Sequence, residues 1–144
     1  MKMPTVLGSL LLAAALTTGS SARAQSDETA RYARYDFNKL MNAFDESLQS
    51  DIPGIVESTI YNLVEYKSYF PERDYSRFAH MLNDIARKNA DPTIAYKASL
   101  AGMYLTYGST IEDKSVFSPY EHETAFEQVA NQLTKKFLLS LSTQ

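Results

Sequence analysis

Two stretches of this chain, "DPTIAYKASLAGMYL" (residues 91–105) and "DIPGIVESTIYNL" (residues 51–63), decide its fold class. Each opens on an aspartate, and a proline follows within two residues. Aspartate is favoured at the N-cap of a helix, and proline is tolerated in the first turn, where its missing N–H costs nothing. Asp51 and Asp91 lie 40 residues apart. The pattern predicts that one kind of helix occurs twice at this interval.

The same interval relates the helices that come before these two stretches. It places Tyr35 on Tyr75 and Met41 on Met81. Repeats of this length are commonly helix pairs that stack, each pair covering the apolar face of the next. We therefore expect two repeat-like units, residues 27–70 and 74–108, followed by a C-terminal helix over residues 118–141.

Apolar residues recur with a helical period through five segments, and no segment alternates with the period of a strand. The expected helices cover residues 27–48, 51–69, 74–88, 91–107 and 118–141. Asp51, Asp74 and Asp91 are the expected starts of three of them. Ser118, in "SPYE" (residues 118–121), is expected to form a capping box for the last helix. The apolar end of that helix, "KKFLLSLS", is expected to pack on the body of the protein.

The second copy resembles a HEAT-type repeat. That family commonly has an aspartate at the start of the second helix and an arginine or lysine six residues later, as Asp91 and Lys97 are here. The resemblance implies that both residues tie one repeat to the next. In the first copy Asp51 keeps its place, but position 57 is a glutamate, and we expect Glu57 to face Lys97 across the repeat boundary. A plain five-helix bundle is the alternative architecture.

The first 24 residues have the pattern of a cleaved signal peptide. The apolar run "VLGSLLLAAAL" (residues 6–16) follows Lys2, and Ala22-Arg23-Ala24 forms a cleavage pattern. The apolar run is too short to span a bilayer as a stable helix. We expect a mature domain over residues 25–144, located in a periplasm or secreted. The pattern over residues 56–105 also resembles small exported bacterial proteins of this HEAT-like kind.

The charge balance limits the classes of partner. Cleavage after Ala24 would remove Lys2 and Arg23 and leave 12 basic side chains against 17 acidic ones, a net charge of −5. An acidic chain with no cluster of basic residues disfavours nucleic acid and anionic lipid headgroups as partners. No second apolar run is long enough for stable membrane insertion. The chain has no cysteine, so helix packing alone must hold the domain together.

Signals for catalysis are weak. His80 and Asp84 are spaced to share one helix face, but two ligands do not make a metal site. His122 lies among acids that suit the first turn of a helix. The sequence has no G-x-S-x-G turn and no glycine-rich phosphate loop. We expect no catalytic residue, metal or cofactor, and an enzyme or metal site at His80, Asp84 or His122 remains the least favoured hypothesis.

Tyrosine is the unusual component, with ten copies and no tryptophan. Several of them lie on the two helices that would line the concave side of a HEAT-type stack, by resemblance. Tyrosine is enriched at binding surfaces because it offers a large contact area at low entropic cost. We expect four of them to be exposed and to form a binding surface: Tyr66, Tyr69, Tyr96 and Tyr107.

The favoured function is therefore a non-enzymatic exported scaffold that binds a protein partner of unknown identity, as a monomer or a weak homodimer. The alternative is a carrier for a small apolar or aromatic ligand. Such a ligand would lie between the helices over residues 51–69, 91–107 and 118–141. The strip of small residues around Gly102 and the apolar tail of the last helix motivate this alternative.

Overall fold

The computed structural model describes residues 36–118 and 120–142. These residues form five α-helices, one short 3₁₀ helix and no strand, which confirms the expected all-helical class. The helices are α2 (Phe37–Leu48), α3 (Pro53–Tyr69), α4 (Ser76–Lys88), α5 (Pro92–Tyr107), η1 (Lys114–Val116) and α6 (His122–Ser142). The predicted leader, residues 27–35 of the first predicted helix and Pro119 lie outside the described residues.

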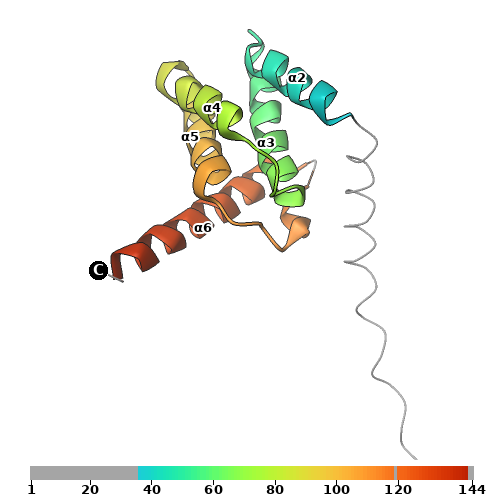
Figure 1. Cartoon of the computed structure of the whole chain (residues 1–144). Coiled ribbons are helices and arrows are strands. Elements are labelled where there is room, and N and C mark those ends of the chain that lie inside the picture. Colours follow the sequence, from blue (N-terminus) through green and yellow to red (C-terminus); the bar gives the residue numbers. More distant parts are fainter. Residues whose placement is uncertain (1–35, 119, 143–144) are drawn as a thin grey trace, which may run out of the picture. The chain divides into compact units, whose positions relative to one another are not determined.

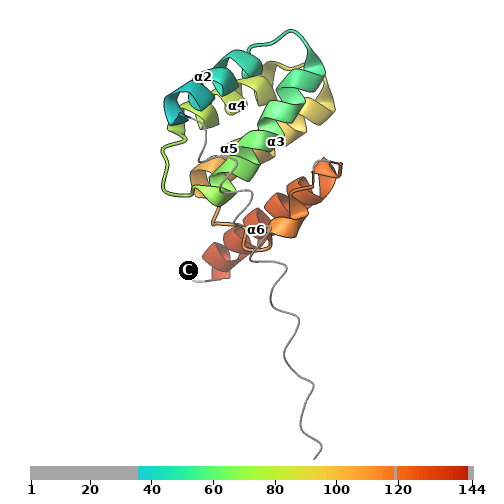
Figure 2. The ribbon, with the colours of Figure 1, turned by 90° about the vertical axis from the view of Figure 1, so that its right-hand side faces the viewer.

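Helices α3 and α5 are central to the described fold (Figure 1). Helix α3 packs on α2, α5 and α6, and α5 packs on α3, α4 and α6. Figure 2 shows α2 and α4 on one side of α3 and α5, with α6 on the other. This arrangement explains why the apolar residues of α3 and α5 cover wide faces, since each helix packs on three neighbours.

The core lies where these helices meet. Its fully buried residues come from α3, α4, α5 and α6: Ile60, Leu63, Val64, Leu82, Ala98, Ala101, Tyr104, Ala125 and Val129. The first two isoleucines of the predicted helix over residues 51–69, Ile52 and Ile55, are exposed. Burial therefore begins one turn into α3, at Val56.

The start of α5 follows the sequence pattern, whereas the start of α3 does not. Asp91 is the N-cap of α5, and its carboxylate accepts hydrogen bonds from the backbone N–H groups of Thr93 (2.8 Å) and Ile94 (3.2 Å). The expectation that Asp51 caps α3 is wrong. The N-cap is Ile52, which makes no side-chain cap hydrogen bond, and Pro53 takes the first helical position.

Two other predicted starts are displaced along the chain. Asp74 accepts hydrogen bonds from Ser76, but Tyr75 is the N-cap of α4. Helix α6 begins at His122 instead of Ser118. The reason is that Ser118 forms a local turn: its hydroxyl accepts from the N–H of Tyr120, and its carbonyl accepts from the N–H of Glu121 and from the hydroxyl of Tyr61.

Glycine permits close packing at two points of α5. A Cβ atom on Gly102 would lie 2.9 Å from Oδ1 of Asn83 and 3.6 Å from the carbonyl oxygen of Ala79, both in α4. Gly108 ends α5, as expected, and a Cβ atom there would lie 2.1 Å from the ring of Tyr104. Gly102 therefore faces α4, and it does not line a space between α3, α5 and α6 as the carrier hypothesis assumed.

Lys114, in the loop over residues 109–117 that follows α5, forms hydrogen bonds to the C-terminal end of α3. Nζ of Lys114 donates to the carbonyl oxygen of Ser68 at 2.8 Å, and it also contacts the hydroxyl of Ser68 and the carbonyl oxygen of Ile111. The hydroxyl of Ser68 donates to Ile111 at 3.1 Å. Ile111 and Val116 are buried beneath this loop. The ammonium thus joins the C-terminal end of α3 to residues 109–117.

The expectation that the apolar end of α6 packs on the body is wrong. Ala125, Val129 and Leu133 lie one turn apart and are buried, but the next residue of that row, Phe137, is 45% exposed and Leu141 is 70% exposed. Figure 1 shows that the last turns of α6 extend past α5. Among the described residues, the last turn of α5 reaches Phe137 through Tyr107, and Leu138, Leu139 and Leu141 stay exposed.

Candidate interaction surface

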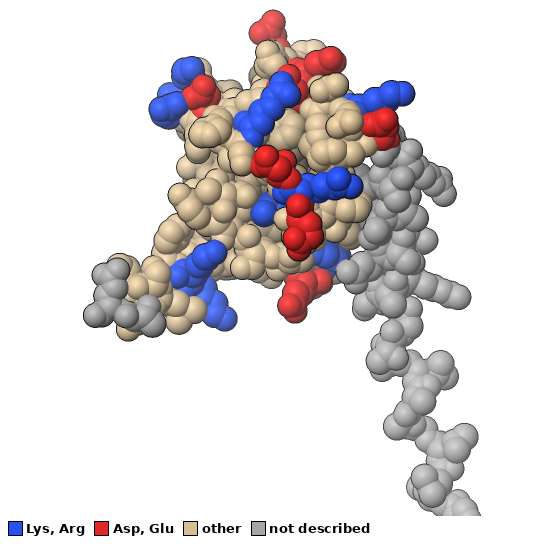
Figure 3. All heavy atoms as spheres, in the orientation of Figure 1, with Lys and Arg blue, Asp and Glu red and all other residues tan. Residues whose placement is uncertain are grey.

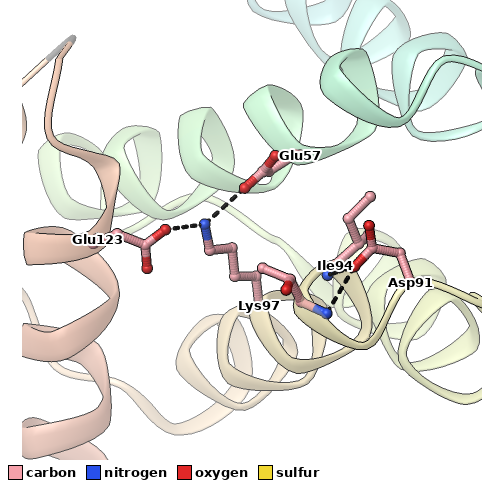
Figure 4. Close-up of polar contacts among 6 residues, drawn as sticks. Glu57, Asp91, Ile94, Lys97 and Glu123 are labelled. Atoms are coloured by element: carbon pink, nitrogen blue, oxygen red, sulfur yellow. Dashed lines mark hydrogen bonds and ion pairs between the residues drawn. The ribbon is translucent and has the colours of Figure 1, made fainter.

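One lysine joins three helices. Lys97 of α5 is only 3% exposed, and its Nζ lies 2.7 Å from Oε1 of Glu57 in α3. The same ammonium pairs with the carboxylate of Glu123 in the first turn of α6. Figure 4 shows the lysine reaching between the two carboxylates, with the Asp91 cap six residues earlier, at the start of α5. The expectation that Glu57 faces Lys97 is confirmed, and Glu123 is a partner that sequence reasoning missed.

The electrostatics of this junction favour the charged lysine. Burial opposes the charge, but hydrogen bonds to Glu123 and Glu57 outweigh it and raise the pKa of Lys97 above its ordinary value. The ammonium also lies 5.3 Å from the centre of the Phe126 ring, a distance at which a cation is attracted to the ring face. Because both carboxylates already neutralise the ammonium, the junction is suited to holding helices together.

An open groove of about 670 Å³ lies beside the junction. Gly54, Glu57 and Ser58 form one wall, and residues 120–124 form the other. His122 stacks on the ring of Tyr61 in α3, with ring centroids 3.9 Å apart. This contact gives His122 a packing role at the start of α6, next to the three acids of the groove, Glu57, Glu121 and Glu123.

Tyr66 is not a surface residue, so the expectation that it is exposed is wrong. It is 4% exposed, and its ring lies among the rings of Phe37, Phe44, Phe70 and Tyr75. Burial raises its pKa, against the nearby charge of Arg73. The cause is α2, because its aromatic residues Phe37 and Phe44 cover the side of α3 on which Tyr66 lies.

Tyr69 is half-buried. Its ring lies 6.3 Å from that of Phe117, and Nζ of Lys114 lies 5.2 Å from its centre. The loop after α5 therefore covers much of Tyr69, which leaves it little surface for a partner.

Tyr96 and Tyr107 are exposed, as expected, with 59% and 52% of their surface accessible. They are eleven residues apart on α5, which is close to three whole turns, so they share one face of the helix and lie about 16 Å apart along it. Tyr96 and residues 123–131 of α6 line a groove of about 260 Å³. Tyr107 packs edge-on against Phe137 of α6, with ring centroids 6.2 Å apart. The tyrosines thus mark both ends of one α5–α6 surface.

The pair of residues singled out for metal binding does not form a site. His80 is exposed in an open groove of about 440 Å³ between α4 and α5, but the carboxylate of Asp84 pairs with Arg87 and Lys88. Across residues 36–118 and 120–142, no group of three or more His, Cys, Asp or Glu side chains is placed to hold a metal ion.

Comparisons with known proteins add no further identification: no family model, curated protein or solved structure matches the chain. Among the described residues, no helix has the length and apolar character needed to cross a membrane.

Proposed function

We propose that this chain is an exported scaffold module whose role is to bind another protein through the outer face of α5 and the adjoining part of α6. The observation that carries the proposal is the pair of exposed tyrosines, Tyr96 and Tyr107, on one face of a helix whose other faces are buried. Exposed tyrosines that lie beside grooves are frequent anchors of protein interfaces.

The surface between the two tyrosines suits an extended or helical segment of a partner. Its span of about 16 Å corresponds to about three turns of helix. Glu127 is exposed beside the groove at Tyr96, and Glu123 lines that groove as well. These acids favour a partner segment that carries lysine or arginine, because opposite charges at a rim speed association.

The proposal includes a HEAT-like stacking of helix pairs. Two observations support it: the Asp91 cap, and the Lys97–Glu57 ion pair that connects the second helix of one predicted pair to the second helix of the other. The resemblance noted in the sequence implies this tie between repeats. In this arrangement α6 is the first helix of a third pair.

Export to a periplasm or the exterior is part of the proposal and rests on the signal-peptide pattern of residues 1–24. The residues proposed to bind the partner make no contribution to catalysis, and the module acts as a monomer or a weak homodimer.

The test is in-cell photo-crosslinking. A photoreactive phenylalanine analogue at position 96 or 107 should trap a partner polypeptide, whereas the analogue at Tyr120, which is 93% exposed elsewhere, should not. Tyr96→Ala with Tyr107→Ala should weaken capture at least about 30-fold, as expected for two interface anchors. The circular dichroism spectrum should not change. If crosslinks at 96 and 107 are no more frequent than at 120, the assignment of this surface is wrong.

A further inference from the structure

The last turns of α6 carry the largest group of exposed apolar side chains in the described part of the chain. Phe137, Leu138, Leu139 and Leu141 are 45%, 62%, 58% and 70% exposed. We call these four residues the α6 tip. Exposed apolar groups of this size, gathered at one point, mark sites that another apolar phase or molecule covers.

The directions of these side chains show what kind of surface would cover them. A helix turns about 100° per residue, so Leu141, Leu138 and Leu139 point about 40°, 100° and 200° away from Phe137. The apolar arc of the tip therefore spans more than half of the helix circumference. One partner helix covers a stripe of about 100°. A fluid apolar phase that surrounds the tip would cover the whole arc.

The charge around the tip is positive, although the protein as a whole is acidic. Lys135 and Lys136 directly precede the tip, and no acidic residue follows Glu127 in the sequence. Both lysines are exposed. Figure 3 shows basic side chains beside the end of α6 and no acidic side chain over that end on the face drawn. The net charge of the whole chain is negative and disfavours anionic lipid as a partner, but it does not show that the charge near the α6 tip is positive.

We propose that the α6 tip docks on the surface of an anionic phospholipid membrane. The four apolar side chains enter the outer part of the acyl layer, while Lys135 and Lys136 lie at the level of the lipid phosphates. This is the distribution of apolar and basic groups found in helices that bind membrane interfaces. The tip does not cross the bilayer, since four apolar side chains support only shallow and reversible binding.

A second copy of the chain fits these observations less well. Four side chains per copy fall far below the roughly 20 to 30 residues a side of a stable interface. A two-fold contact between tips would also bring the Lys135–Lys136 pairs of both copies together, and like charges would repel. An anionic lipid surface instead attracts both lysines.

The proposal is tested by vesicle sedimentation with the processed protein isolated from cells that produce the full chain, its N-terminus determined by mass spectrometry. The vesicles contain phosphatidylcholine alone or with about one third phosphatidylglycerol, at low ionic strength. We expect binding to the anionic vesicles. Leu138→Ser with Leu141→Ser should weaken it about tenfold per leucine, because each loses most of its apolar contact.

Charge variants test the second half of the proposal. Lys135→Gln with Lys136→Gln should weaken binding to anionic vesicles about fivefold per charge and leave binding to phosphatidylcholine unchanged. Two matched controls should bind as wild type: Ile52→Ser, which removes an equally exposed apolar side chain, and Lys39→Gln with Lys88→Gln, which removes the same charge elsewhere.

Three results would overturn the proposal. The first is that wild type does not sediment with anionic vesicles, and the second is that the tip variants bind as well as wild type. The third is a dimer in sedimentation velocity that the leucine variant abolishes without any vesicle binding, which would assign the tip to a second copy. The proposed protein surface adjoins the tip, because Tyr107 contacts Phe137 and its carbonyl oxygen accepts from Lys136. Crosslinking at position 96, which lies at the far end of that surface, tests the protein surface separately from the tip.

Discussion

The Lys97 junction gives a prediction about how two carboxylates share one buried ammonium. Glu123 is 73% exposed and Glu57 is 35% exposed, whereas the side chain of Lys97 is 4% exposed. An exposed ion pair contributes at most about 1 kcal/mol. Glu123→Gln should therefore lower the free energy of unfolding by less than about 1 kcal/mol, and Glu57→Gln by about 1 to 2 kcal/mol, because Glu57 is less hydrated.

The double variant should cost more than the sum of these values. With Glu57→Gln and Glu123→Gln together, the ammonium of Lys97 stays buried with no opposite charge. Breaking a buried pair in this way costs about 3 to 5 kcal/mol. The coupling between the two sites should thus be about 1 to 2 kcal/mol, measured by urea unfolding at pH 7 with circular dichroism as the signal.

Two further measurements separate charge from packing. Lys97→Met keeps a long unbranched side chain at this buried position and should cost less than the double variant, since an apolar replacement leaves no buried ammonium that needs a partner. The pKa of Lys97 is raised in the folded state, so its stabilisation is present below the ordinary value of 10.5 and is lost as the pH rises through the higher folded value. If the double variant costs no more than the sum of the single changes at pH 7, the ammonium has water as an adequate partner and the reasoning is wrong.

Three other substitutions are open to the same unfolding assay. Gly108→Ala should destabilise by at least about 2 kcal/mol because its methyl group would overlap the buried ring of Tyr104, whereas Gly54→Ala, with open space around it, should stabilise by up to about 1 kcal/mol. Tyr104→Phe removes a buried hydroxyl that makes no hydrogen bond within ordinary distance limits, although Ser68 and the backbone of Ile111 lie close enough to lower its pKa against the effect of burial; the change should therefore alter the free energy of unfolding by less than about 1 kcal/mol at pH 7. Burial raises the pKa of Tyr104 to about 12, so this residue's contribution is present below pH 10 and lost as the pH rises toward 12; the phenylalanine variant should lose less stability over that range. Lys114→Met should cost about 1 to 3 kcal/mol, because the Ser68 and Ile111 oxygens lose a donor, and limited proteolysis should then cut within residues 109–117.

Helix caps formed by residues that lie close together in the sequence could be predicted from the sequence alone. Asp91 and Pro92 start α5, and Gly108 ends it, because a cap needs only the N–H groups two or three residues away. The same prediction of helix starts failed where a residue suited to capping a helix can also form a local turn. Ser118 has the spacing of a capping box, but it does not cap a helix. Its carbonyl oxygen accepts a hydrogen bond from the hydroxyl of Tyr61 in α3, and α6 starts four residues later, at His122.

The binding surface was predictable only in part. The row positions of Tyr66 and Tyr96 give no reason to separate them, yet one is buried and the other exposed. The difference comes from α2, which covers one side of α3 and leaves the outer face of α5 open. Periodicity shows which residues share a face, but it does not show which neighbour covers that face.

The helical class, the start and end of α5 and the Glu57–Lys97 pairing follow from local propensity and from an interval within the sequence. The second carboxylate partner of Lys97, the burial of Tyr66 and the exposure of the α6 tip depend on how helices far apart in the chain meet. Apolar side chains such as Phe137 and Leu141 have the same tendency to be buried as Val129. Whether they are covered depends on how far the next helix extends, because the hydrophobic effect is non-directional and acts only where a packing surface exists.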